Sequence, residues 1–345
     1  MANKKTYRAE RAEKNIEKYE ELRAQLPGLC ESYLNNKGIR CKTDTLVMTC
    51  WDLLDFFKWL ILANSSLSGK APKDVTLSDL ENLTFDDINE FQTYRLHVMN
   101  NKPSRVARMM SSIRTFFKYE YTHGFLTKDP TSGSATVRIP RNKSVVKMEN
   151  TEVKALVSAV ENSASKSERT RKLQQRNKYR DTAIIILLLN TGIRISELVG
   201  LNLTDADIES SSPSIFVIRK GGGSDQVFLN QTAVEALSNY INLERDQYLP
   251  AEENETALFL SNRHQRFTVR SVQKMVEKYV KEALPQRTDV HVHTFRKTYG
   301  TTLYDITGDI KMVQDVLGHS DPSTTSRYYI GSSHKREAKD IDPYG

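Results

Sequence analysis

A short stretch near the C-terminus combines residue types that could bind and attack a phosphate. His293 and Arg296 are three residues apart. Further on, His319 ends a Leu-Gly-His triplet, and Tyr328 follows nine residues later. Residues at i and i+3 share one face of a helix, so the first pair can act together. A guanidinium binds phosphate oxygens through parallel hydrogen bonds, and a nearby phenol can serve as a nucleophile. The stretch therefore predicts a phosphate-binding site with a phenol beside it.

Glycines and capping residues predict the helices that position these side chains. Gly308 can end the helix that holds the His-x-x-Arg pair, and Asp309 can start the next one. Gly318 is placed to end that second helix, so the histidine after it should project from a turn. Ser323 can then cap a third helix that carries Tyr328.

A second arginine lies at a predicted turn in the middle of the chain. Residues 181–190 are typical of a buried helix, and Gly192 can end that helix in the left-handed conformation. Arg194 then adjoins the start of a short helix, whose unpaired N–H groups favour an anion. Glu197 can orient the guanidinium. Taken alone, this Arg–Glu pair would be an ordinary surface ion pair.

A β-hairpin is predicted by alternating segments at 214–220 and 225–229 around a Gly-Gly-Gly-Ser turn. Lys220 lies at its mouth, where a mobile ammonium could reach into a groove. Most hairpin lysines, however, only keep a sheet edge soluble.

Together these motifs resemble the tyrosine recombinases, the phage-integrase and Xer family of site-specific DNA recombinases. The resemblance covers most of the second half of the chain and implies six catalytic residues: Arg194, Lys220, His293, Arg296, His319 and Tyr328. It implies that Tyr328 attacks the scissile phosphate and forms a 3′-phosphotyrosyl bond, with Glu197 in support. The bond keeps the ester energy, so no metal, ATP or other cofactor is expected.

Some positions depart from the family pattern or leave alternatives open. Phe295 replaces a leucine, Lys297 follows the motif arginine where histidine is common, and Arg219 precedes Lys220 where glycine is usual. Tyr329 could replace its neighbour as nucleophile, although the spacing from the histidine favours Tyr328.

Other readings of the same residues lead to other classes of protein. His291, His293 and His319 could bind zinc, but the phosphate site already uses the second of these, so no metal site is expected. An accessory DNA-binding protein of the same fold, or a type IB topoisomerase, would share much of this pattern.

Positive charge gathers between residues 101 and 150, which hold ten Lys or Arg and three acids. On the predicted helix 105–123, one face is polar and basic, and it could contact phosphates or simply face solvent. The candidates for DNA binding are Arg105, Arg108, Arg138, Arg141 and Lys143.

The length of 345 residues suits two domains. The predicted fold is mainly α, with a helical core-binding domain followed by a mixed α+β catalytic domain that contains a small antiparallel hairpin. The expected order is an N-terminal helical arm (1–24), a helical core DNA-binding domain (25–130), a basic linker (131–149) and the catalytic domain (150–345). Within these, the sequence predicts a core position for Trp51 and an exposed loop at 166–180.

Composition points to a DNA partner in the cytoplasm. The net charge is +7 and the isoelectric point is about 9.1, which favours a polyanion. Three scattered cysteines, no signal peptide and no membrane-length apolar run suggest a reduced, cytoplasmic protein. The resemblance further implies double-stranded DNA with inverted half-sites and a homotetramer on two sites, with accessory proteins unknown.

Overall fold

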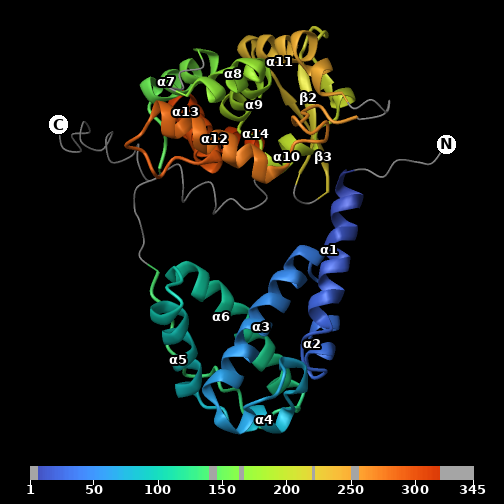
Figure 1. The fold of residues 1–345 in the computed structure, drawn as a ribbon, viewed down its shortest axis with the longest axis vertical. Helices are drawn as coiled ribbons and strands as arrows, with labels where there is room; N and C mark the ends of the chain where they lie inside the picture. Colours follow the sequence, from blue (N-terminus) through green and yellow to red (C-terminus); the bar gives the residue numbers. More distant parts are fainter. Residues whose placement is uncertain (1–6, 140–145, 163–166, 220–221, 250–255, 319–345) are drawn as a thin grey trace, which may run out of the picture. The chain divides into compact units, whose positions relative to one another are not determined.

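The computed structural model describes residues 7–139, 146–162, 167–219, 222–249 and 256–318 (Figure 1). The chain divides into two compact units, Met1–Arg141 and Asn142–Gly345. Each unit is described by itself. In the part of the chain that is described, no helix combines the length and apolar character needed to cross a membrane.

The first unit is entirely helical in its described residues (Figure 1). Its α-helices are α1 (Tyr7–Arg23), α2 (Cys30–Gly38), α3 (Thr43–Ala63), α4 (Leu77–Glu81), α5 (Phe85–Thr93) and α6 (Pro103–Thr122). A π-helical turn, Tyr94–Val98, continues α5, and 3-10 turns lie at Ser65–Leu67 and Pro72–Asp74.

Edge-to-face aromatic packing forms the core of this unit. The ring of Phe56 in α3 lies 5.3 Å from that of Phe91 in α5 and 5.5 Å from that of Phe117 in α6. These three side chains are fully buried. The helical spacing of apolar residues in α3 and α6 thus predicts the face that each helix buries.

Two expectations for the first unit need correction. Trp51 is 40% exposed rather than in the core, because it lies at the edge of the apolar stripe, where the Lys18 ammonium lies 5.3 Å from its ring centre. The N-terminal segment is helical, yet it is not simply an arm. Tyr19 and Leu22, one turn apart on α1, are buried against the core of the unit.

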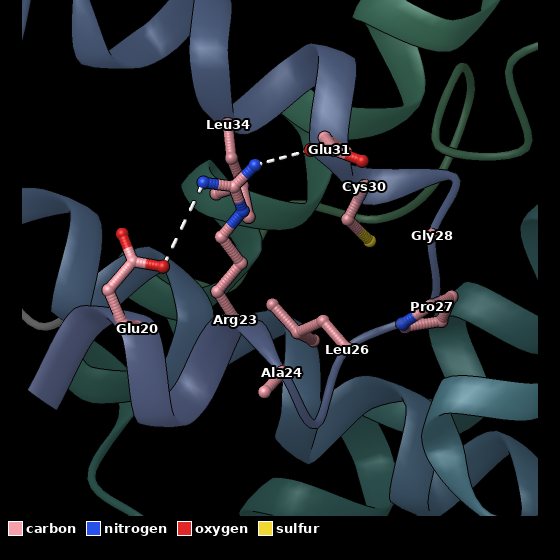
Figure 2. A pocket seen from close by; sticks show the side chains of 9 residues that line it. All are labelled: Glu20, Arg23, Ala24, Leu26, Pro27, Gly28, Cys30, Glu31 and Leu34. Carbon is pink, nitrogen blue, oxygen red and sulfur yellow. Dashed lines mark hydrogen bonds and ion pairs between the residues drawn. The ribbon is translucent and has the colours of Figure 1, made fainter.

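A pocket of about 240 Å³ lies where α1 ends and α2 begins. Figure 2 shows the Arg23 guanidinium between the carboxylates of Glu20 and Glu31, with Cys30 on the pocket wall. Burial keeps the pKa of that thiol well above its usual value. The thiol is therefore unreactive at neutral pH, and the arginine serves to join the two helices.

The second unit is built around a buried helix, α9 (Lys178–Thr191). The other α-helices are α7 (Asn150–Asn162), α8 (Glu168–Arg176), α10 (Ile195–Gly200), α11 (Gln231–Leu243), α12 (Val269–Ala283), α13 (Val292–Thr307) and α14 (Ile310–Leu317). Helices that precede and follow α9 in the sequence pack against it, mainly α7, α11 and α13. Short 3-10 turns lie at Leu203–Asp205 and Arg245–Tyr248. The expected loop at 166–180 was wrong, because most of it forms α8, whose Gln174 side chain is buried and donates to Glu282.

A small antiparallel sheet lies at one side of the second unit (Figure 1). Its strands are β1 (Ala206–Asp207), β2 (Ser214–Ile218) and β3 (Ser224–Phe228), in the order β1-β2-β3. Ile218 pairs with Ser224 at the end of the ladder, so β2 and β3 form a hairpin. The predicted hairpin is confirmed.

Candidate active site

Arg194 lies at the junction between α9 and α10. Gly192 ends α9 in the left-handed conformation (φ 61°), and Arg194 is the extended residue before α10. Glu197 accepts from both ends of this arginine, from its backbone N–H and from Nη1, each at 2.8 Å. The Glu197 side chain is 2% exposed and that of Arg194 is 24% exposed. The buried carboxylate therefore holds the guanidinium in place, while part of the Arg194 side chain stays open to solvent.

Gly192 is needed for a second reason besides its backbone conformation. A Cβ atom at this position would lie 2.6 Å from Cδ1 of Tyr299 and 2.8 Å from Cδ2 of Leu317. The missing side chain lets the end of α9 lie directly against α13 and α14. As a result, the turn before Arg194 touches the helices that carry the second arginine and the Leu-Gly-His triplet.

Arg296 joins these same segments through their backbones. It projects from α13, is 8% exposed, and donates from Nη1 to the Gly192 carbonyl (2.6 Å) and from Nη2 to the Leu317 carbonyl (2.5 Å). A charged group bonded to two carbonyls is held in one orientation. Arg194 and Arg296 thus come together from positions about one hundred residues apart.

His293 lies one turn before Arg296 on α13, beside a pocket of about 280 Å³. Ile195 of α10 and Arg270 of α12 also line this pocket. Partial desolvation of its ring lowers the pKa of His293, and the positive charges of Arg296, Lys297 and Arg194 lower it further. The imidazole is therefore neutral at pH 7 and able to accept a proton.

The turn that precedes the second histidine has the predicted form. Gly308 ends α13 in the left-handed conformation, and Asp309 caps α14 by accepting from the N–H groups of Lys311 and Met312. Gly318 ends α14, again with positive φ (60°). The described residues end there, one residue before His319.

Several predicted site residues lie outside the described residues: Lys220, His319, Tyr328, Tyr329, Arg141 and Lys143. Their roles stay predictions. The zinc alternative includes His319 and stays open for the same reason. Across the described ranges, no group of three His, Cys, Asp or Glu side chains is arranged to hold a metal ion.

The predicted DNA-binding face of α6 has an internal partner. Arg108 donates from Nη1 and Nη2 to the two oxygens of Asp52, each at 2.7 Å, and Ser112 donates to the same carboxylate at 2.8 Å. Asp52 is 1% exposed, while the Arg108 side chain is 43% exposed. Arg105 and Arg138 are exposed. Sequence periodicity could not reveal the buried carboxylate, which belongs to α3.

Comparison with known proteins identifies the class to which this fold and site belong. Residues 146–336, more than half of the chain, match the phage integrase family. The chain therefore belongs to the phage integrase family and is a tyrosine recombinase, an enzyme that breaks and rejoins DNA strands at specific sites. The predicted family, fold class and enzyme class are confirmed.

Individual relatives match almost the whole chain. The tyrosine recombinase XerC of Caldanaerobacter subterraneus subsp. tengcongensis is 29% identical over 92% of this chain and 87% of its own. The tyrosine recombinase XerS of Streptococcus mutans is 30% identical over 96% and 99%, respectively. The Tn1549 transposon integrase, solved in complex with a circular intermediate DNA, has a TM-score of 0.65 at 17% identity, covering 91% of this chain and 98% of that one. This last likeness supports the fold.

Proposed function

We propose that this recombinase exchanges strands between two DNA sites through a phosphotyrosyl bond formed by Tyr328. The observation that carries the proposal is the meeting of Arg194 and Arg296 through the Gly192 backbone, beside His293. Two guanidiniums on one phosphate neutralise the charge that builds on its non-bridging oxygens during displacement. The site is suited to this charge even before DNA arrives.

The proposed reaction begins with the attack of the Tyr328 oxygen on phosphorus. Phenol has a pKa near 10 and needs help to lose its proton at neutral pH, and the neutral His293 imidazole can accept that proton. The P–O bond to the 5′ oxygen breaks, and Lys220 supplies the proton that this oxygen takes up. His319 binds the phosphate alongside the two arginines. A 5′ hydroxyl of the partner strand then reverses the same steps, so the phosphodiester is restored without ATP.

The assembly we propose is a homotetramer that holds two DNA duplexes, each with inverted half-sites. Exchange between two sites requires four cleavages, and one active site per subunit supplies one of them. The polar segment 332–345 is then a candidate to pack on a neighbouring subunit. Arg105, Arg108, Arg138, Arg141 and Lys143 would contact the phosphate backbone in this assembly. A cytoplasmic location follows from the DNA substrate.

The biological role proposed is Xer-like recombination or the integration of a mobile element. Similarity to XerC and XerS over nearly the whole chain favours the first. The DNA beside the gene distinguishes the two, since the ends of an integrated element carry repeats and a resolvase acts on one chromosomal site.

The test of the proposed nucleophile uses a nicked suicide duplex. Cleavage next to the nick releases a short fragment with a 5′ hydroxyl, which diffuses away and prevents rejoining. The native chain should form a covalent adduct that survives denaturing electrophoresis. Tyr328→Phe should form none, whereas Tyr329→Phe, the matched control, should form it normally. An adduct with Tyr328→Phe would falsify the assignment.

A further inference from the structure

Arg219 occupies the place before the predicted catalytic lysine where the family pattern has glycine, and its guanidinium joins three elements of the site. It donates from Nε to Oδ2 of Asp225 in β3 at 2.8 Å, and Nη2 forms an ion pair with the same oxygen at 2.7 Å. Nη1 donates to Oε2 of Glu197 in α10 at 3.1 Å, and Nη2 to the Val316 carbonyl in α14 at 3.2 Å. Its side chain is 12% exposed. A guanidinium with this many directional partners is held in place and is not presented to solvent.

The turn after α14 supplies an independent observation. A Cβ atom on Gly318 would lie 2.8 Å from Nε and 3.1 Å from Cζ of Arg219. The guanidinium therefore fills the space beside the turn that leads to the second histidine. Only glycine allows this contact, because the backbone there also has positive φ.

We propose that Arg219 is a positioning residue for DNA cleavage, acting on Arg194 through Glu197 and tying the hairpin to the end of α14. The inference rests on the proposed role of Arg194. In the sequence, Arg219 directly precedes Lys220, and the Gly318 turn directly precedes His319. One side chain, only 12% exposed, thus connects the β-hairpin, α10 and the end of α14, and the sequence places the proposed catalytic groups next to two of these.

The electrostatic reason lies in the way the Glu197 carboxylate is shared. Oε1 accepts from the Arg194 side chain, while Oε2 accepts from the Arg194 backbone and from Arg219. Without Arg219, Arg194 would be the one cationic side chain, among the described residues, bonded to a carboxylate that is 2% exposed. The carboxylate would then hold that guanidinium more tightly and offset more of its charge. Arg219 therefore leaves Arg194 free to bind a phosphate.

The first test replaces Arg219 by methionine, which keeps the length and removes the charge. Single-turnover cleavage of the suicide duplex at saturating enzyme should slow by roughly 10- to 100-fold, the range typical of losing a partner that orients a functional side chain. The dissociation constant for DNA should change by less than about threefold, because a side chain this buried makes no large direct contribution to binding.

The matched control is Arg287→Met. Arg287 also bonds two carboxylates and a carbonyl, those of Glu152, Asp289 and Lys147, but none of these belongs to the proposed site. The Arg287→Met variant should lower the melting temperature of the protein and leave the cleavage rate close to normal. Cleavage by Arg219→Met at a normal rate would overturn the proposal. Should Arg219→Met fail to fold, Arg219→Gln, which also removes the charge but keeps hydrogen-bonding groups, takes its place, with the same expected slowing and unchanged DNA affinity.

The second test asks whether Arg219 acts through Glu197. In a Glu197→Gln background, Arg219→Met should slow cleavage by less than about threefold, because the charge that it balances is gone. The same slowing in both backgrounds would show that Arg219 acts otherwise and would refute the inference. Arg194→Ala separates this outcome from failure of the proposed function. If it abolishes cleavage while Arg219→Met does not affect it, the proposed role of Arg194 survives without a positioning role for Arg219.

Discussion

The protonation state of His293 is set by its neighbours rather than by its type. Partial desolvation of its ring lowers its pKa most, and the positive charges of Arg296, Lys297 and Arg194 lower that pKa further. A histidine in such a place is a base and not a source of positive charge. In the proposed mechanism, the two arginines neutralise the phosphate and the imidazole accepts the phenolic proton.

The first prediction concerns the pH dependence of cleavage at subsaturating DNA, which reports the free enzyme. Because the pKa of His293 is lowered, its imidazole stays neutral until the pH falls below the ordinary value of 6.5. The acid limb of the rate profile should therefore lie below pH 6.5. Lys297→Met should move this limb upwards, since one of the lowering charges is removed. DNA affinity measured over the same range is the control, and a limb above pH 6.5 in the native chain contradicts the prediction.

Asp52 affects both the orientation and the net charge of Arg108, one of the residues proposed to contact DNA. The bidentate pair orients the guanidinium and offsets its charge, although 43% of the side chain is exposed. A guanidinium that is oriented and partly neutralised in this way suits a contact that positions the DNA backbone. It suits less well a contact that mainly adds electrostatic attraction to DNA.

The second prediction is that Asp52→Asn binds DNA more tightly at low salt, by roughly three- to tenfold, with a steeper salt dependence by about one counterion. The reason is that Arg108 regains its full charge. Fluorescence anisotropy at several salt concentrations measures both quantities. The double variant with Arg108→Ala serves as control and should lose the gain. An unchanged salt slope in Asp52→Asn would mean that Arg108 only stabilises the unit.

At the scale of elements, the site depends on glycines that end helices. Gly192, Gly308 and Gly318 all have positive φ at the ends of α9, α13 and α14. The sequence predicts all three ends, because the left-handed conformation favours glycine. What the sequence does not predict is that two of them also allow close approach, Gly192 to Tyr299 and Gly318 to Arg219.

The third prediction compares Gly192→Ala with Gly308→Ala, which have nearly equal φ (61° and 64°). Both should lose about 1 kcal/mol to backbone strain. Gly192→Ala should lose a further ~1–3 kcal/mol from overpacking against Tyr299 and Leu317, whereas a Cβ on Gly308 would meet no described atom within 4 Å. Gly192→Ala should also slow cleavage, because the carbonyl of residue 192 accepts a hydrogen bond from Arg296 and a shift of this turn would move that arginine. Denaturant unfolding and cleavage assays check this, and equal losses in the two variants would contradict it.

At the scale of the whole molecule, each unit has its own core. Both tryptophans, Trp51 and Trp59, belong to α3, so tryptophan fluorescence reports the first unit alone. That core also holds a carboxyl group, Glu120, which is 1% exposed and whose Oε1 has no hydrogen-bond partner among the described residues. Burial raises the pKa of Glu120 to about 7.

The fourth prediction follows from that pKa. Between its ordinary value of 4.5 and about 7, the folded unit binds a proton that the unfolded chain has released. The free energy of unfolding should therefore fall as pH rises through this window, by on the order of 1–3 kcal/mol. Glu120→Gln should abolish this fall and be the more stable chain at pH 8. Denaturant unfolding followed by tryptophan fluorescence measures it, and an unchanged pH dependence in Glu120→Gln would refute the assignment.

Features that depend on neighbouring residues along the chain could be predicted from local patterns. Helix ends at Gly192, Gly308 and Gly318, the hairpin turn, and the spacing of the His-x-x-Arg pair are local chemistry, and they were enough to identify the family. The exposure of Trp51 and the helix α8, which was expected to be a loop, were less well determined, because both depend on what packs nearby.

Which distant groups lie together could be read only from the folded chain. Arg296 binds a carbonyl 104 residues away, Arg219 one 97 residues away, and Arg108 a carboxylate 56 residues away. No periodicity reports such partners, since they are set by how whole helices pack. For that reason a residue that looked like a departure from a motif, Arg219, is found at the centre of the contacts around the active site.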